Sequence, residues 1–315
     1  MANLYWMIGI SGSGKSTLAK KISSEKRAMI VSSDKVREEL YGDENTQGDP
    51  NEVFKIVHNK IFTYLSTGYD VIYDATNISF KNRKKLFKFL ESKYINANNI
   101  AVVMTTSLNT CLKNNSSRER IVPEDVILRQ HRNFNIPFFE EGFNEIIIDK
   151  WFENRSIVKE DNKKHKHAFN YANLISIFHS MMFFDQKNPH HNLTLGEHCV
   201  KTYMTIKEYS DDKSLLYAAL LHDIGKLDTQ TTDDDGICHY FNHSNVGCYN
   251  LLQNLDVFSL SPYEIINALF YINYHMLPFN WETAKTKEKY NKVFGNEKFN
   301  NLLLLNKIDK DCSID

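Results

Sequence analysis

The sequence predicts two parts of different fold class: an α/β part with a parallel sheet and flanking helices, followed by an all-α part. Strand-like and helix-like segments alternate up to about residue 150, the pattern of a parallel sheet wrapped by helices. Beyond that point the apolar residues recur at helical spacing, and ten of the twelve histidines lie at or beyond His165. We therefore expect domains over residues 1–152 and 168–315, joined by a polar linker over 153–167.

The composition is that of a globular chain with balanced charge. Its 315 residues are 42% hydrophobic and 12% aromatic, which is enough to bury a core. The 38 Lys and Arg residues nearly balance 39 Asp and Glu residues, so a nucleic-acid substrate would be bound locally, at an end, and not along a duplex. The five cysteines include no CxxC pair, and no leader or long apolar run is evident. We expect a cytoplasmic protein with no membrane partner, for which a homo-oligomer is compatible with the sequence.

Five apolar segments are expected to form the sheet, and three helical segments to flank it. The strands are predicted over residues 3–8, 28–31, 70–74, 99–105 and 145–148, and the helices over 17–24, 52–65 and 81–90. In such sheets ligands bind beyond the carboxyl ends of the strands, so the residues that follow each strand are the candidate site.

A phosphate-binding loop connects the first strand to the first helix. Residues 9–17, Gly-Ile-Ser-Gly-Ser-Gly-Lys-Ser-Thr, fit the pattern G-x-x-x-x-G-K-[ST], and the complete pattern in this context disfavours a simple glycine turn. Its glycines let backbone N–H groups face a polyphosphate at the positive end of the helix. Lys15 would reach the outer phosphates and Ser16 would bind Mg²⁺. We expect ATP and Mg²⁺ to be held by Gly9, Ser11, Gly12, Ser13, Gly14, Lys15, Ser16 and Thr17.

Asp34 and Arg37 follow the second predicted strand and share one face of a helix, one turn apart. A carboxylate at this place can accept a proton from an attacking hydroxyl, and the arginine can bind a phosphate of the acceptor. Asp34 also suits a helix N-cap, and the spacing alone does not separate the two roles.

Polar residues follow the third predicted strand as well. Asp74, Thr76 and Asn77, with Arg83 shortly after, can orient an acceptor or hold a magnesium-bound water. Alternatively, Thr76 or Asn77 caps the next helix.

Arg118 and Arg120 precede a helix start at Val122-Pro123. Together they can form a lid over the transferred phosphate and stabilise its charge. Isolated surface arginines are usually only solvated, and it is the other motifs that favour a role for these two.

In this order, the phosphate loop, Asp34-x-x-Arg37, Asp74-Ala-Thr-Asn77 with Arg83, and the lid arginines resemble the 5′-hydroxyl polynucleotide kinase family over the first half of the chain. The resemblance implies that Asp34 is the general base for the 5′-hydroxyl and that Arg37 contacts the phosphate of the terminal nucleotide. It also implies that one of the two lid arginines contacts the γ-phosphate. Relatives often carry Arg-Asn where this chain has Lys113-Asn114, which weakens the case for an additional donor contact there.

Metal-ligand residues accumulate in the all-α part. An apolar, buried helix over 215–221 ends in His222-Asp223, two polar residues whose burial is costly unless a metal satisfies them. The other candidates are His198, His239, His243, His275 and Asp309. Imidazoles and carboxylates without thiols suit Mn, Ni, Co, Fe or Mg. The alternative, histidines that are merely satisfied in a core, would make this density a coincidence.

The order His198 … His222-Asp223 … Asp309 resembles the HD phosphohydrolase superfamily, and His222-Asp-Ile-Gly-Lys226 is its most specific part. The resemblance implies that His198, His222, Asp223 and Asp309 bind one metal and that His243 and His275 bind a second. A bound ion would lower the pKa of a water to make hydroxide and would neutralise the phosphate under attack. Lys226 could contact that phosphate or help to protonate the leaving group, and His191 is another candidate phosphate contact; either could equally be a surface residue.

The two resemblances together predict an enzyme that heals broken nucleic-acid ends, RNA in particular. It would phosphorylate 5′-hydroxyl ends with a nucleoside triphosphate and remove a 2′,3′-cyclic phosphate or a 3′-phosphate. The run Asp233–Gly236 is interpreted as a turn and not as the nucleophile motif of an aspartate phosphatase. Two alternatives remain: a nucleoside or small-metabolite kinase fused to an HD nucleotide phosphohydrolase, and a non-catalytic, ATP-gated nucleotide-sensing module.

Overall fold

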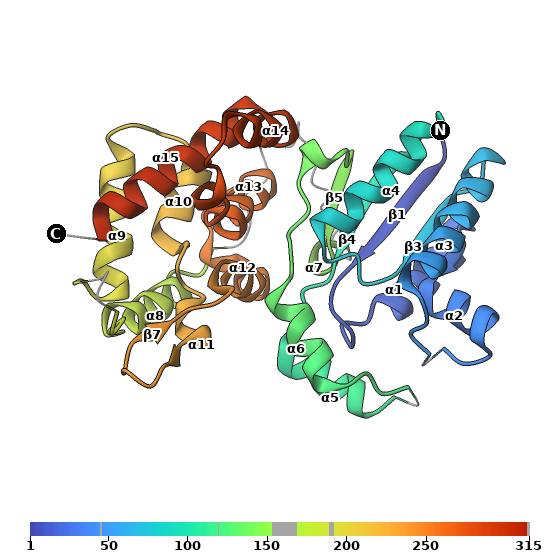
Figure 1. The fold of residues 1–315 in the computed structure, drawn as a ribbon, viewed down its shortest axis with the longest axis horizontal. Helices are drawn as coiled ribbons and strands as arrows, with labels where there is room; N and C mark the ends of the chain where they lie inside the picture. Colours follow the sequence, from blue (N-terminus) through green and yellow to red (C-terminus); the bar gives the residue numbers. More distant parts are fainter. Residues whose placement is uncertain (45, 119, 153–168, 189–191, 314–315) are drawn as a thin grey trace. The chain divides into compact units, whose positions relative to one another are not determined.

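The chain folds as two compact units, Met1–Lys159 and Glu160–Asp315 (Figure 1). The computed structural model describes residues 1–44, 46–118, 120–152, 169–188 and 192–313, so the expected linker over 153–167 lies outside the described residues. No described helix is both long and apolar enough to cross a membrane.

A five-stranded parallel sheet forms the centre of the first unit. Its strands are β1 (Asn3–Ile8), β2 (Met29–Ser32), β3 (Val71–Asp74), β4 (Asn98–Val103) and β5 (Glu145–Ile148), in the order β2-β3-β1-β4-β5. The strands are nearly continuous apolar runs because helices cover both faces of the sheet. The five predicted strands and their parallel arrangement are confirmed.

Seven helices accompany this sheet: α1 (Lys15–Lys26), α2 (Ser33–Tyr41), α3 (Pro50–Ser66), α4 (Phe80–Ser92), α5 (Leu108–Ser116), α6 (Glu124–Arg132) and α7 (Asp149–Phe152). Alternate strand residues face opposite layers. Tyr5 and Met7 pack with Ala19 and Ile22 of α1, whereas Trp6 stacks on Phe87 of α4 with ring centroids 4.6 Å apart. The alternation thus fixes which helix covers which face.

The second unit is helical, with α8 (Tyr171–Met182), α9 (Leu195–Lys207), α10 (Lys213–Leu221), α11 (Lys226–Thr229), α12 (His243–Gln253), α13 (Pro262–Tyr274), α14 (Ala284–Phe294) and α15 (Asn296–Ser313). α10 and α13 form its core: most residues of α13 are buried, and five of the nine residues of α10 are buried with them. One small antiparallel ladder, β6 (Thr231–Thr232) with β7 (Cys238–His239), adds to the predicted all-α architecture. The Asp233–Gly236 turn connects its strands, with Gly236 at φ 80°.

Arg83 is a structural residue of the first unit, and the structure does not place it at an acceptor site as expected. Its side chain is fully buried and makes two hydrogen bonds to the Glu141 carboxylate, at 2.8 and 2.6 Å. It also donates to the carbonyl oxygens of Asn77, Asn135 and Ile136. A buried guanidinium needs partners for its donors, and these contacts join α4 to the segment that leads to β5.

We expect Arg83→Ala to lower the free energy of unfolding of the first unit by about 3–5 kcal/mol, because Glu141 is left buried without its partner. The control is Lys60→Ala, which removes a solvent-exposed pair with Glu39 and should cost less than about 1 kcal/mol. Calorimetric unfolding of the full-length variants measures both. Equal, small losses for the two variants would contradict this structural role.

Candidate functional sites

The phosphate loop has a backbone that glycine alone accommodates at two positions. Gly12 and Gly14 have φ of 85° and 88°, and a Cβ on Gly12 would lie 2.1 Å from the carbonyl oxygen of Cys111. Lys15 folds back over the loop, where its Nζ donates to the carbonyl of Ile10 at 2.8 Å. Burial lowers the pKa of Lys15 to about 8, although the nearby Asp74 acts in the opposite direction. A buried ammonium at the start of α1 is suited to the outer phosphates of a nucleotide.

Three polar side chains from α6, α5 and the segment before α5 hold this loop in place. Gln130 Oε1 accepts from the backbone N–H of Ser11 at 2.7 Å, and Asn114 and Thr106 donate to the carbonyls of Gly12 and Ser13, both at 2.9 Å. No loop-supporting role was predicted for these residues. Each contact joins residues 93 to 119 positions apart, a separation that carries no periodic signal.

Asp74 lies beside Ser16 at the carboxyl end of β3. Burial raises the pKa of Asp74, while a hydrogen bond from the Ser16 hydroxyl and the charge of Lys15 act in the opposite direction. A hydroxyl and a carboxylate are hard oxygen ligands of the kind Mg²⁺ prefers, so the pair fits the magnesium ion of a bound nucleotide.

The carboxylate of Asp34 forms ion pairs with two arginines. Arg37 Nη1 lies 2.8 Å from one carboxylate oxygen of Asp34, and Arg120 pairs with the other. Ser32 Oγ, not Asp34, caps α2, so the carboxylate is not used for capping. Arg37 Nε is buried and has no hydrogen-bond partner among the described residues, which leaves one donor for a ligand. The side chain of Asp34 is 44% exposed and therefore accessible.

Arg118, the other lid arginine, contacts α5. Its Nη2 donates to Asn115 Oδ1 at 2.9 Å, and its charge helps to lower the pKa of Lys15. The two lid arginines thus have different partners: Arg120 pairs with Asp34, and Arg118 bonds to Asn115.

The residues after Asp74 support the sheet edge. The carbonyl of Thr76 accepts from Gly9 N–H at 3.0 Å, and Asn77, at φ 48°, donates through Nδ2 to the carbonyl of Met7 at 2.9 Å. The cap of α4 is Ser79, so neither residue takes the alternative capping role. Asn77 is buried and its Nδ2 donates to the carbonyls of Met7 and Tyr73, which makes it a support for the loop.

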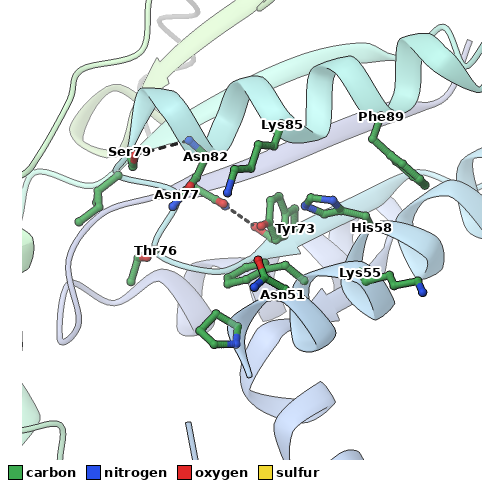
Figure 2. Close-up of a pocket in the computed structure, with 13 residues that line it drawn as sticks. Asn51, Lys55, His58, Tyr73, Thr76, Asn77, Ser79, Asn82, Lys85 and Phe89 are labelled. Atoms are coloured by element: carbon green, nitrogen blue, oxygen red, sulfur yellow. Dashed lines mark hydrogen bonds between the residues drawn. The ribbon is translucent and has the colours of Figure 1, made fainter. Parts of the chain in front are cut away.

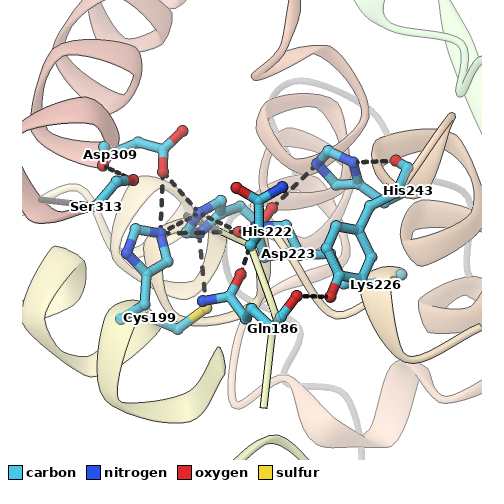
Figure 3. Close-up of polar contacts among 12 residues, drawn as sticks. Gln186, Cys199, His222, Asp223, Lys226, His243, Asp309 and Ser313 are labelled. Carbon is cyan, nitrogen blue, oxygen red and sulfur yellow. Dashed lines mark hydrogen bonds and ion pairs between the residues drawn. The ribbon is translucent and has the colours of Figure 1, made fainter. Parts of the chain in front are cut away.

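Four buried side chains converge in the second unit: His198 of α9, His222 and Asp223 after α10, and Asp309 of α15 (Figure 3). His198 Nε2 lies 3.0 Å from Asp309 Oδ1 and 3.3 Å from His222 Nε2, and His222 Nε2 lies 3.4 Å from Asp223 Oδ2. Two imidazole nitrogens and two carboxylates within this distance fit a divalent ion.

A second group shares Asp223. Its Oδ1 lies 3.0 Å from His243 Nε2 and 3.6 Å from His275 Nε2, while its Oδ2 faces the first group. The two carboxylate oxygens therefore point to different histidine sets, which allows Asp223 to bridge two ions. His239 belongs to neither group, because it pairs with Asp233 at the surface, at 2.8 Å.

Backbone carbonyls orient three of the four histidines. The Nδ1 atoms of His222, His243 and His275 lie 2.8–2.9 Å from the carbonyl oxygens of Ala219, Tyr240 and Ile272. A proton on Nδ1 leaves the lone pair on Nε2, the atom that faces the cluster.

The ionisation of the buried side chains in the cluster favours the binding of a cation. Burial alone would lower the pKa of His222, but the adjacent Asp223 carboxylate holds it well above its ordinary value. The pKa of Asp223 lies well below its ordinary value, because Lys226 and His222 outweigh the opposing effect of burial. Without metal, His222 therefore keeps a proton that a divalent ion must displace.

Lys226 is buried beside the same carboxylate. Its Nζ lies 2.7 Å from Asp223 Oδ2 and donates to Gln186 Oε1 at 2.8 Å. The hydroxyl of Tyr240 donates to the backbone carbonyl of Gln186. Gln186 and Tyr240 were not predicted, and His191 lies outside the described residues.

Two family models match the chain: an AAA domain over residues 4–137 and an HD domain over 195–310. The chain joins a P-loop kinase-like domain to an HD domain. Both expected domain types, and their order, are confirmed. The HD domain match includes all six residues of the two metal-ligand groups, from His198 to Asp309.

No curated protein matches the chain. Among solved structures, a sugar kinase from Janibacter sp. HTCC2649 is similar at 15% identity over 47% of this chain and 84% of that one, with a TM-score of 0.36. The Pnkp1/Rnl/Hen1 RNA repair complex is similar at 18% identity, with a TM-score of 0.37, over 54% of this chain and 53% of that one. The chain thus spans about half the length of this second protein.

The shared carboxylate predicts the metal content of HD-domain variants. We expect two equivalents of divalent ion in the native chain, about one in His275→Ala, and none in Asp223→Ala, which removes a ligand from both groups. Elemental analysis of the purified proteins measures this. The control Asp233→Ala, which removes an exposed carboxylate outside both groups, should retain both ions. Full metal content in folded Asp223→Ala would overturn the bridging role.

Proposed function

We propose that this chain is a bifunctional enzyme that heals nucleic-acid ends, RNA in particular. Its first domain would transfer phosphate from ATP to a 5′-hydroxyl, and its HD domain would remove a 2′,3′-cyclic phosphate or a 3′-phosphate. The observation that carries the proposal is that the Asp34 carboxylate pairs with both Arg37 and Arg120. The charge of Asp34 also acts on the pKa of Lys15 in the phosphate loop.

This arrangement provides each group that phosphoryl transfer to a hydroxyl requires. Lys15 and the loop N–H groups would bind the ATP phosphates, and Ser16 and Asp74 would hold Mg²⁺, which neutralises charge on the phosphates. Asp34 would accept the proton of the 5′-hydroxyl as its oxygen attacks the γ-phosphorus and the bond to the departing ADP breaks.

The arginines around Asp34 would have two roles, binding of the acceptor and stabilisation of the transferred phosphoryl group. Arg37 has a donor, Nε, to bind the phosphate next to the terminal nucleoside. Arg118 and Arg120 would stabilise the charge of the transferred phosphoryl group. Arg120 is bound to Asp34 in the structure, so it must release that carboxylate to reach the phosphoryl group.

In the HD domain, His198, His222 and Asp309 would hold one ion and His243 and His275 a second, with Asp223 between them. Such ions supply an acidified water and neutralise the phosphate ester. Lys226 forms an ion pair with Asp223 and is the cation nearest to that carboxylate among the described residues. Its ammonium group would be suited to protonate the leaving oxygen.

The two activities should separate by mutation. With ATP, Mn²⁺ and an oligoribonucleotide that carries 5′-hydroxyl and 2′,3′-cyclic phosphate ends, Asp34→Ala should lower 5′ phosphorylation about 10²- to 10⁴-fold and leave 3′-end hydrolysis intact. Asp223→Ala should lower 3′-end hydrolysis and leave 5′ phosphorylation intact. Both ends are analysed after one incubation, and Glu39→Ala, an exposed acidic residue of the same helix α2, is the control.

The same incubation separates the alternatives. Phosphate transfer only to mononucleosides or small metabolites would replace the polynucleotide substrate with a small acceptor. Absence of both reactions, with nucleotide bound, would favour a sensing module.

A further inference from the structure

A slot of about 400 Å³ lies between α3 and α4 in the first unit, next to the end of β3 (Figure 2). Its position on the face of the sheet that Tyr73 occupies makes it distinct from the phosphate loop, although the two meet at Thr76. Thr76 lines the slot, and its carbonyl accepts the N–H of Gly9, the first residue of the loop.

Aromatic rings form the inner part of the slot. His58 lies 5.7 Å from Phe89, 6.3 Å from Phe54 and 6.5 Å from Tyr73, measured between ring centroids. Burial, with a smaller effect of Lys85, lowers the pKa of His58 to about 4, so its ring is neutral at pH 7. These walls are apolar, uncharged and planar.

Polar groups line the outer part. The side chains of Asn51, Asn82 and Lys85 border the slot, and all three residues are exposed. Among the described residues, none forms a hydrogen bond with the side-chain amides of Asn51 and Asn82. Two amides with both donor and acceptor capacity are thus available to a ligand.

The slot also lies on the side of the phosphate loop where Asp74 and Arg37 are found, which is the side proposed for the acceptor. Asp74, the proposed magnesium ligand, is separated from Thr76 by one residue, and the charge of Arg37 acts on the phenol of Tyr73. The supports of the loop that come from α5 and α6 contact Ser11 and Gly12 instead. An acceptor that enters the slot would therefore pass Asp34, Arg37 and Asp74.

We infer that this slot binds the base of the acceptor's 5′-terminal nucleoside, an inference that rests on the proposed kinase function. A nucleobase has two π faces for the aromatic walls and a polar edge for the amides, and such stacking tolerates different bases. A phosphate group would not suit the uncharged, aromatic inner part. A cavity of this volume is within the range of small-molecule sites.

Two acceptors that differ only at the first nucleotide test this inference. One oligoribonucleotide begins with adenosine, and the other begins with an abasic ribose that has the same 5′-hydroxyl. The native chain should phosphorylate the first with a kcat/KM about tenfold or more higher, because stacking on an aromatic side chain contributes this much or more. Phe54→Ala should remove most of that preference by raising the KM for the adenosine acceptor, with the KM for ATP unchanged.

Tyr64→Ala is the matched control, since Tyr64 lies further along α3, packs against Tyr69 and does not line the slot. If Phe54→Ala fails to fold, Lys85→Ala against Lys88→Ala makes the same comparison on α4, since of these two lysines only Lys85 borders the slot.

Equal efficiency of the adenosine and abasic acceptors overturns the inference and leaves the proposed kinase function in place. No phosphorylation of either oligonucleotide, with free adenosine also inert, overturns the proposed function itself. Free adenosine as the better acceptor supports recognition of the base in the slot and overturns its assignment to a polynucleotide end.

Discussion

A charge removed from water must be paired within the protein, and the described part of both units is organised around such pairs. Asp223 is the central case. Its carboxylate is almost completely buried, one oxygen contacts Lys226 and the first histidine group, and the other contacts the second group. Six helical or turn segments converge on this carboxylate and its partners, so the helical packing of the HD domain and the candidate metal site are a single arrangement.

Buried charge has different consequences in the first unit. The Arg83–Glu141 pair is closed, with its donors used by protein acceptors, and it only stabilises the fold. Lys15 and Asp74 are also buried, but their partners are loop carbonyls and a hydroxyl that a nucleotide and its magnesium ion can replace. The difference between a structural and a functional buried charge is whether its partners can be exchanged for a ligand.

The kinase centre illustrates a second use of pairing. Asp34 is only partly buried and holds Arg37 and Arg120, one from its own helix and one from the lid segment. The second of these contacts holds Arg120 beside the carboxyl edge of the sheet. The aromatic slot adjoins the same edge, because the parallel strands β1, β2 and β3 all end on the side where Asp34, Arg37 and Thr76 lie.

Local sequence patterns predict the five strands of the first unit, the helices α1, α3, α4 and α10, the phosphate loop and the His-Asp pair at the end of α10. These features depend on local periodicity or on a contiguous motif, which a single stretch of chain contains. The order of the motifs along the chain was also sufficient for the two domain types.

The roles of individual polar residues, in contrast, depend on contacts between distant parts of the chain. The tertiary structure showed that Ser32 and Ser79 are the helix caps, that Arg83 and Asn77 support the fold, and that Asp223 faces two histidine groups. It also revealed Gln186 beside Lys226. Each outcome depends on which distant side chains share a buried volume, and that depends on packing between elements that no local pattern records.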